Sequence, residues 1–349
     1  MLAAYGGPSQ IFTAAPASLR EVCSSNVAQA LAKPPAEFDA RLAAALAWLT
    51  GGELRRVLLL GDAAYPPRLL HSADPPLLLY VLGDVTLLGA PSVAVVGSRK
   101  PSAQGADNAR GFARELSDAG FTVVSGLAQG IDGAAHEGAL DGVSSTIAVV
   151  GSGLDSVYPA RHRALAQRIA ERGALVSEFA PGTPPLPENF PQRNRIIAGL
   201  SLGTLVVEAA LRSGSLITAR LALESNREVF AVPGSVLSEH ARGCHALIKQ
   251  GAQLVESAQD IIETLRGMPS AMAPTPAAEG AADVAANATV DVVLDAVLDA
   301  LGADPVTLDA LLARTGWGIA ELSARLLDLE LEGRVARLPG GLFQRRWAG

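Results

Sequence analysis

The chain has 349 residues, of which 49% are hydrophobic, a composition that excludes a disordered protein and allows two or three domains. Its net charge of −7 excludes a uniformly basic surface for nucleic acid or membrane, although a local basic site remains possible. The two cysteines, Cys23 and Cys244, form no Cys-x-x-Cys pair, so we expect neither a disulfide framework nor a bound metal. The sequence shows no secretory signal and no bilayer-spanning stretch, which predicts a soluble cytoplasmic protein without membrane contact.

Residues 1–64 are expected to form a small helical domain, because apolar residues recur at helical spacing between Ala36 and Leu49. The segment 267–288 is dominated by proline, alanine and glycine without a visible period, and we interpret it as a flexible linker. These boundaries leave a central domain at 65–266 and a third domain at 289–349.

The central domain alternates short β-branched runs with helical stretches. The runs are Ser92–Val96, Thr122–Val124, Thr146–Val150, Ala174–Val176, Thr204–Val207 and Glu228–Val232. This alternation predicts an α/β fold, a Rossmann-like parallel sheet with helices on both faces. In such a sheet ligands bind outside the carboxyl ends of the strands, so we look for chemistry in the turns that follow them.

The first of these turns is Gly97-Ser98-Arg99-Lys100, directly before a predicted helix. A helix N-terminus attracts anions, and two cations beside it favour a phosphate site. The alternative is an ordinary turn with two solvated cations. The turn lacks the G-x-G-x-x-G pattern of dinucleotide-binding folds, so a nicotinamide-dependent oxidoreductase is disfavoured.

The second turn contains Gly126 and Gly130, which either admit a ligand backbone or only allow a helix to pack on a strand. The following helix carries His136, which we interpret as a hydrogen-bonded histidine near the sheet rather than as a catalytic base.

The third turn begins at Gly153 and continues to Tyr158, Arg161 and Arg163. An aromatic ring beside a basic cluster could stack on a base while the cations hold phosphate. Equally, Tyr158 could be buried beneath the loop.

A proline-rich connection, 178–192, leads into Arg193, Asn194 and Arg195. Two arginines around an asparagine suit phosphate contacts combined with an amide contact to a base edge. The alternative is a helix start with surface salt bridges.

The turn Ser213-Gly214-Ser215 is a further candidate nest of backbone N–H groups. Glu208, at the end of the preceding strand, is the carboxylate that an enzyme acting on a nucleotide would use. Because no motif indicates a particular reaction, we predict no catalytic residue. The alternative interpretation is a nucleotide-processing Rossmann-like enzyme.

The central segment resembles the DNA-processing protein A family, DprA, also called Smf. Six blocks carry the resemblance in order: GSR at 97–99, SGLAQGID at 125–132, GSGLD with YP at 151–159, PQRNRIIAGLS at 191–201, SGSLITA at 213–219 and REVFAVPG at 227–234. The sequence departs from the family where Gly243-Cys244-His245 replaces the usual glycine, small polar residue and asparagine.

This resemblance implies a homodimeric, non-enzymatic protein that binds single-stranded DNA and needs no cofactor. It further implies that the protein protects incoming single-stranded DNA and helps load RecA onto it in natural transformation and homologous recombination. The loading would take place on strands coated by single-strand-binding protein. Arg99 and the block from Arg193 to Arg195 would line the DNA groove.

The terminal segments fit accessory domains of that family. Residues 1–64 would be similar to a sterile-alpha-motif (SAM) or helix-hairpin-helix module. Residues 289–349 resemble a winged helix, with helices at 290–301, 308–315 and 319–332 and a hairpin formed by 335–338 and 342–345. Because the third helix is acidic, it would repel phosphate, and we expect it to contact protein instead.

Overall fold

A computed structural model describes residues 1–5, 8–33, 35–267, 297, 301, 306–308, 311–312, 317–338 and 342–345. The chain divides into two compact units, Met1–Glu53 and Leu54–Gly349. No described helix combines the length and the apolar character that crossing a membrane requires.

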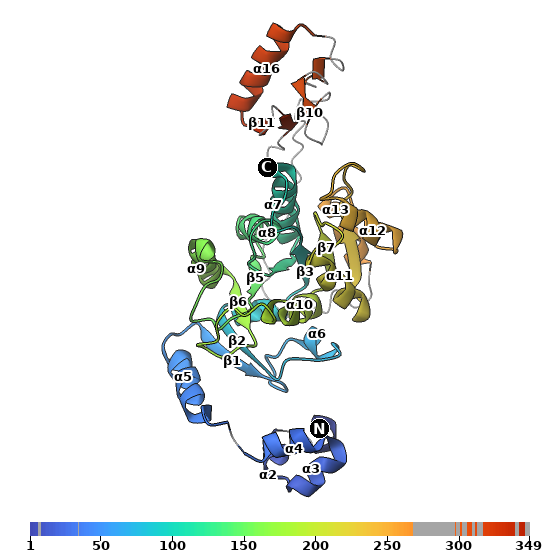
Figure 1. The fold of residues 1–349 in the computed structure, drawn as a ribbon. Coiled ribbons are helices and arrows are strands. Elements are labelled where there is room, and N and C mark those ends of the chain that lie inside the picture. Colours follow the sequence, from blue (N-terminus) through green and yellow to red (C-terminus); the bar gives the residue numbers. More distant parts are fainter. Residues whose placement is uncertain are drawn as a thin grey trace. The chain divides into compact units, whose positions relative to one another are not determined.

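The first unit is helical, as the sequence predicts (Figure 1). Its helices are α1 Leu2–Tyr5, α2 Pro8–Thr13, α3 Pro16–Val22, α4 Ser25–Leu31 and α5 Phe38–Thr50. Ile11, Leu19 and Ala28 form its small core. The stretch with helical spacing after Ala36 corresponds to α5. Within α5, Trp48 is buried, whereas the other apolar residues are exposed or half-buried.

The second unit is built on a nine-stranded sheet. Its strands are β1 Arg55–Leu59, β2 Leu78–Gly83, β3 Ser92–Val96, β4 Thr122–Ser125, β5 Thr146–Val149, β6 Ala174–Ser177, β7 Gly203–Val206, β8 Glu228–Ala231 and β9 Gln253–Leu254. The spatial order is β1-β2-β6-β5-β4-β3-β7-β8-β9. The strands from β3 to β9 pair in parallel, whereas β1 and β2 join antiparallel at one edge. The predicted Rossmann-like α/β fold is therefore confirmed.

Helices cover both faces of this sheet. They are α6 Pro67–Leu70, η1 Val85–Leu88, α7 Ala103–Asp118, α8 Ile131–Leu140, η2 Ala160–His162, α9 Arg163–Arg172, α10 Asn189–Leu200, α11 Ser215–Glu224, α12 Arg242–Lys249 and α13 Ala258–Arg266. In β3, Val93 and Val95 join a core with α7, α8 and α13, while Ala94 and Val96 join a core with α10, α11 and α12. Both faces of the central strands are thus buried, which explains their unbroken apolar sequences.

The sheet begins earlier than the domain boundary expected at residue 65. Strand β1 pairs with β2 from Arg55↔Leu82 to Leu59↔Leu78. Residues 55–59 therefore belong to the sheet and not to the helical segment, because their backbone hydrogen bonds are made with β2.

The C-terminal part contains a three-stranded sheet in the order β10-β12-β11 and the helix α16 Ile319–Leu331. The strands are β10 Val306–Thr307, β11 Val335–Leu338 and β12 Leu342–Arg345, so the predicted hairpin has the expected bounds. Leu322, Leu326 and Leu329 of α16 form a core with Val335. The predicted linker 267–288, apart from Gly267 at the end of α13, lies outside the described residues, as do most of the predicted helices 290–301 and 308–315.

Candidate nucleic-acid interface

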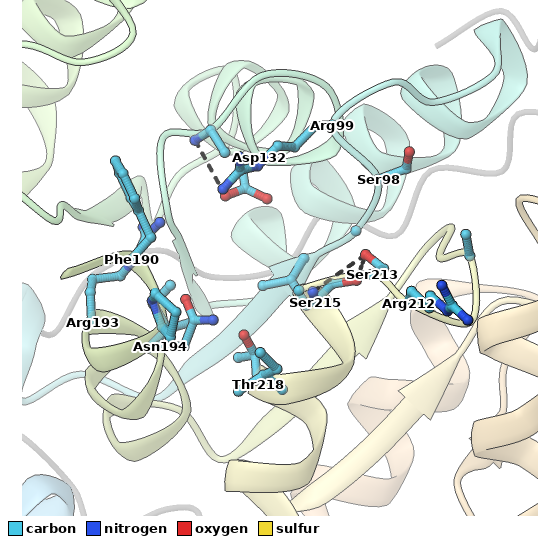
Figure 2. A pocket seen from close by; sticks show the side chains of 18 of the residues that line it. Ser98, Arg99, Asp132, Phe190, Arg193, Asn194, Arg212, Ser213, Ser215 and Thr218 are labelled. Carbon is cyan, nitrogen blue, oxygen red and sulfur yellow. Dashed lines mark hydrogen bonds between the residues drawn. The ribbon is translucent and has the colours of Figure 1, made fainter. Parts of the chain in front are cut away.

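The strand order reverses direction between β3 and β7, which lie side by side in the sheet although the strands β4, β5 and β6 separate them along the chain. This is a topological switch point, where the two crossovers leave the sheet on opposite sides and open a crevice. A pocket of about 800 Å³ lies there, lined by residues from 96–100, 190–194 and 210–218 (Figure 2). Most predicted site residues line it: Gly97, Ser98, Arg99, Lys100, Tyr158, Arg193, Asn194, Ser213, Gly214 and Ser215.

The turn after β3 is fixed on both sides by backbone hydrogen bonds. Ser98 N–H donates to the Glu208 carbonyl at 2.7 Å, and Ile131 N–H donates to the Ser98 carbonyl at 3.1 Å. A side chain at Gly97 would lie within 2.8 Å of Ile131 and of the Glu208 carbonyl, so only glycine fits there. The Glu208 carboxylate accepts hydrogen bonds from the N–H and hydroxyl of Ser102 at the start of α7, at 2.9 and 2.6 Å. The carboxylate suspected for the enzyme alternative is thus held by a helix terminus and does not line the pocket.

The turn presents Arg99 and Lys100 as exposed cations, and neither forms an ion pair with any described residue. The Arg99 guanidinium lies 5.9 Å from the ring centre of Phe190, and the Phe190 and Tyr158 ring centres are 5.6 Å apart. Tyr158 is 51% exposed, so it is not buried beneath its loop. The pocket therefore has a cation and two aromatic rings at one wall. Sequence reasoning missed Phe190, a lone aromatic residue that directly precedes the Pro191 of the PQRNR block.

Arg193 is buried, with only 4% of its surface exposed. Its Nη1 donates to the carbonyls of Gly126 and Val149, the first at 2.6 Å. Burial lowers the pKa of its guanidinium to about 10, with Asp132 opposing the shift. These bonds join α10 to the ends of β4 and β5. The geometry therefore favours a structural role for Arg193 over the phosphate contact that the sequence suggests.

Asp132 holds the same turn from the other side. Its Oδ2 accepts from the N–H groups of Gly126 and Ala128, at 3.1 and 3.3 Å. Burial raises the pKa of this carboxyl, whereas Arg193 and the two N–H donors oppose the shift. A side chain at Gly126 would collide with both Arg193 and Asp132, so the glycine is needed to let the two charges approach one peptide.

His136 completes the support of this turn. Its Nε2 accepts from Leu127 N–H at 3.2 Å, and its Nδ1 lies 2.8 Å from the hydroxyl of Thr146. That hydroxyl donates to the Val123 carbonyl, so His136 Nδ1 carries the proton and the ring is neutral. Burial lowers the pKa of His136 to about 3. The interpretation of His136 as a hydrogen-bonded histidine near the sheet is confirmed.

The turn 126–130, which these side chains support, packs against the turn 97–100 that carries Arg99. Gly130 has φ +83°, and a side chain there would lie 2.3 Å from the Ser98 carbonyl. Leu127 also has a positive φ, 57°, which is strained for a non-glycine residue. Because side-chain hydrogen bonds from Asp132, His136 and Arg193 hold the turn, it forms a rigid backing for Ser98 and Arg99. Gly126 itself lines a smaller hollow of about 170 Å³ beside the main pocket, together with Arg99 and Tyr158.

Several predicted residues lie outside the pocket. Arg195 forms ion pairs with Asp74 at 3.1 Å and Glu178 at 2.8 Å, which matches the salt-bridge alternative. Arg161 and Arg163 are exposed on η2 and the start of α9, beyond Tyr158. Gly153 lies beside Asp155 and the Ala180 carbonyl.

The opposite wall is the Ser213-Gly214-Ser215 turn at the start of α11. The two serine hydroxyls are 2.7 Å apart, and nothing lies within 4 Å of a side chain placed at Gly214. Exposed Arg212 lines the pocket beside them. Thr218, one turn further along α11, also lines it and was missed by sequence reasoning.

The departure at Cys244 does not alter the pocket. Its side chain is fully buried behind β7, with Sγ 3.5 Å from the Val206 carbonyl. Burial raises the pKa of this thiol to about 12, which keeps it protonated and unreactive. Among the described residues, no group of three or more histidine, cysteine, aspartate or glutamate side chains could hold a metal ion.

The fold and the pocket together define a Rossmann-like protein with a cationic switch-point pocket and a C-terminal winged helix. The family model described as DNA recombination-mediator protein A matches residues 56–266, and the DprA winged helix domain matches residues 273–341. The chain belongs to this DprA/Smf family. It is 45% identical to Protein Smf from Escherichia coli over 285 residues, which are 81% of this chain and 76% of that protein.

Two solved structures share the fold. DNA processing protein A from Streptococcus pneumoniae aligns with a TM-score of 0.63 and 40% identity, over 72% of this chain and 86% of that one. DNA processing protein A from Helicobacter pylori aligns with a TM-score of 0.55 and 33% identity, over 60% of this chain and 96% of that one. The Helicobacter structure is described as revealing a single-stranded DNA binding mode.

Proposed function

We propose that the chain binds single-stranded DNA in the switch-point pocket and that it acts as a recombination mediator rather than as an enzyme. The observation that carries this proposal is the wall formed by Arg99, Phe190 and Tyr158. A single-strand site needs two parts. Cations contact the phosphates, and exposed aromatic rings stack on the unpaired bases. A duplex has its bases already stacked and cannot use the rings.

Relatives supply the remaining parts of the proposal. In line with the family resemblance, the chain protects incoming single strands from degradation and helps load RecA onto them. It does so on strands covered by single-strand-binding protein, as a homodimer in the cytoplasm, during natural transformation and homologous recombination. The acidic helix α16 suits contact with another protein better than contact with DNA.

The test is fluorescence anisotropy of a labelled oligothymidine against protein concentration across a series of salt concentrations. We expect tight binding that weakens steeply with salt, because bound phosphates release counterions. Arg99→Glu reverses the charge at the ring wall and should weaken binding by at least about tenfold. The matched control is Arg114→Glu, which makes the same charge change on the exposed side of α7, outside the pocket, where Arg114 lies 3.8 Å from Asp118.

A duplex of equal length should bind far more weakly than the single strand. If Arg99→Glu and Arg114→Glu bind oligothymidine equally well, the pocket is not the binding site. If the unmodified chain does not bind at low salt, the single-strand proposal is wrong and the nucleotide-enzyme alternative must be tested by incubation with nucleoside monophosphates.

A further inference from the structure

The helix α16 in the C-terminal part has two apolar faces, and the fold uses one of them. The first face packs into the core of this part through three buried leucines, as described above. The second face carries Ile319, Leu327 and Leu331, which are 62%, 56% and 80% exposed. Because the core is formed by the first face, the exposed side chains do not stabilise the fold, and such a patch marks an interaction site.

The exposed side chains form a single row along the helix. Ile319, Ser323, Leu327 and Leu331 are each four residues apart, a spacing that places them on one face. The Ser323 hydroxyl donates to the Ile319 carbonyl at 2.7 Å, so it is satisfied within the helix and needs no polar partner. We call these four residues the exposed row of α16. A row of this period is a ridge that fits the groove of another helix.

Acidic side chains lie on both sides of the C-terminal half of this row. Helical geometry places Glu330 on one side and Asp328 and Glu332 on the other, and all three are exposed. Half-buried Arg325 lies 4.0 Å from Asp328 and 3.5 Å from Glu332. Glu330 forms no ion pair with any described residue. The row is therefore an apolar strip with a negative charge along each side.

These acidic residues are placed where the helix itself favours cations. The C-terminal end of a helix carries a partial negative charge, so acidic side chains there reduce its stability. The last turn of α16 contains no basic residue that would compensate. The stability of the helix does not explain this charge pattern, whereas a positively charged partner does.

The charge also decides between classes of partner. Residues 319–332 contain four acidic residues and one arginine, so the phosphates of DNA would be repelled. A second copy that paired through the same helix would bring like charges together. A helix with basic residues beside an apolar row gains both the apolar contact and the charge pairs.

We propose that the exposed row of α16 docks a basic amphipathic helix of another protein. The apolar face of that helix packs on Leu327 and Leu331, while its lysines or arginines pair with the acidic residues on both sides. This inference rests on the protein contact proposed above for α16 and names the chemistry of the partner. Single-strand binding at the switch-point pocket is a separate property.

The probe is a fluorescein-labelled synthetic peptide that forms an amphipathic helix, with a row of leucines flanked on both sides by lysines. Two control peptides have the same length. One carries glutamates in place of the lysines, and the other has its leucines and lysines in an order that gives no apolar face. Fluorescence anisotropy with the unmodified full chain should show binding of the basic amphipathic peptide and much weaker binding of both controls.

Two variants locate the contact on α16. Leu327→Ser combined with Leu331→Ser removes the apolar part of the row and should raise the Kd of the basic peptide at least about tenfold. Glu330→Lys reverses one flanking charge and should raise this Kd about two- to fivefold at low salt, with a smaller effect at high salt. The matched controls are Val143→Ser, at a position that is 83% exposed, and Glu263→Lys, on the exposed side of α13. Both controls should leave the Kd unchanged.

Two further measurements separate docking from folding and from DNA binding. Glu330→Lys places a cation near the C-terminal end of α16, so its melting temperature should equal or exceed that of the unmodified chain although peptide binding is weaker. Both α16 variants should bind oligothymidine as the unmodified chain does, because the switch-point pocket is lined by residues between 96 and 218.

Three results would overturn the docking surface. If the unmodified chain does not prefer the basic amphipathic peptide to both controls, α16 does not select a basic apolar face. Unchanged affinity in the double leucine variant would place the peptide elsewhere on the chain. A lower mass of that variant than of the unmodified chain in sedimentation equilibrium would mean that a second copy covers the row. If the unmodified chain binds the peptide but not oligothymidine, the single-strand proposal fails while the docking surface stands.

Discussion

Replacement of Arg193 tests whether this arginine stabilises the fold or contacts a DNA phosphate. In Arg193→Met, the carbonyls of Gly126 and Val149 lose their side-chain donor in a buried site. An unsatisfied buried acceptor costs about 1–3 kcal/mol, so the free energy of unfolding should fall by roughly 2–6 kcal/mol. Asp132 also loses its nearby positive charge, which adds to the loss. Urea unfolding of the variant and of the unmodified chain measures this difference.

The binding assay gives a second, independent readout. A cationic side chain that contacts a DNA phosphate contributes about one unit to the slope of log Kd against log salt concentration. A residue that only supports the fold contributes nothing to this slope. Arg193→Met should raise the Kd at every salt concentration with an unchanged slope, while Arg99→Ala should reduce the slope by about one. Arg195→Met, on the same helix but paired with carboxylates, serves as the control and should leave the slope unchanged. The reasoning is refuted if Arg193→Met keeps full stability and reduces the slope as Arg99→Ala does.

Three further perturbations test the turns and rings around the pocket. Gly130→Ala should lower the melting temperature more than Gly182→Ala, because both glycines have positive φ but only the first side chain would collide, 2.3 Å from the Ser98 carbonyl. Tyr158→Ala should weaken oligothymidine binding by about 1–3 kcal/mol without changing stability, since the ring is half exposed. Because the pKa of His136 is about 3 when folded and about 6.5 when unfolded, protons bind the unfolded chain preferentially and stability falls as pH falls below 6.5. The loss should be roughly 2 kcal/mol from about pH 7 to pH 5, and pH-dependent urea unfolding should show a shallower loss in His136→Gln.

The central strands could be predicted from the sequence because burial on both faces leaves a continuous β-branched run. Each of the six predicted runs overlaps one strand, and Ser92–Val96 agrees in both bounds. The antiparallel strands β1 and β2 were not predicted. β1 has exposed and half-buried positions, including two arginines, and so lacks such a run. β9 has only two residues, too few to show any period.

The site was predictable at the strand ends and not along the helix that follows the proline-rich loop. Parallel topology alone brings the turns after β3 and β7 to one crevice, so Gly97 to Lys100 and Ser213 to Ser215 could be identified from their positions. Arg193 and Arg195 are two positions apart in a helix, so they face different directions, and the sequence does not indicate which faces the sheet. Phe190 belongs to no periodic pattern, and neither a glycine nor a charge in the sequence marks Thr218 as a residue that lines the pocket.

The net charge of −7 helps to explain why the site is a pocket and not a surface. An acidic body repels nucleic acid in general, so affinity depends on the few places where cations are unpaired and backed by a rigid turn. Arg99 meets both conditions, because it forms no ion pair with a described residue and its turn is bonded to Glu208 and Ile131. On the proposed function, a strand whose bases are free gains contact with the aromatic rings in addition to the cations. A duplex gains only the cations against the same repulsion, and on the proposed function this difference is the source of single-strand selectivity.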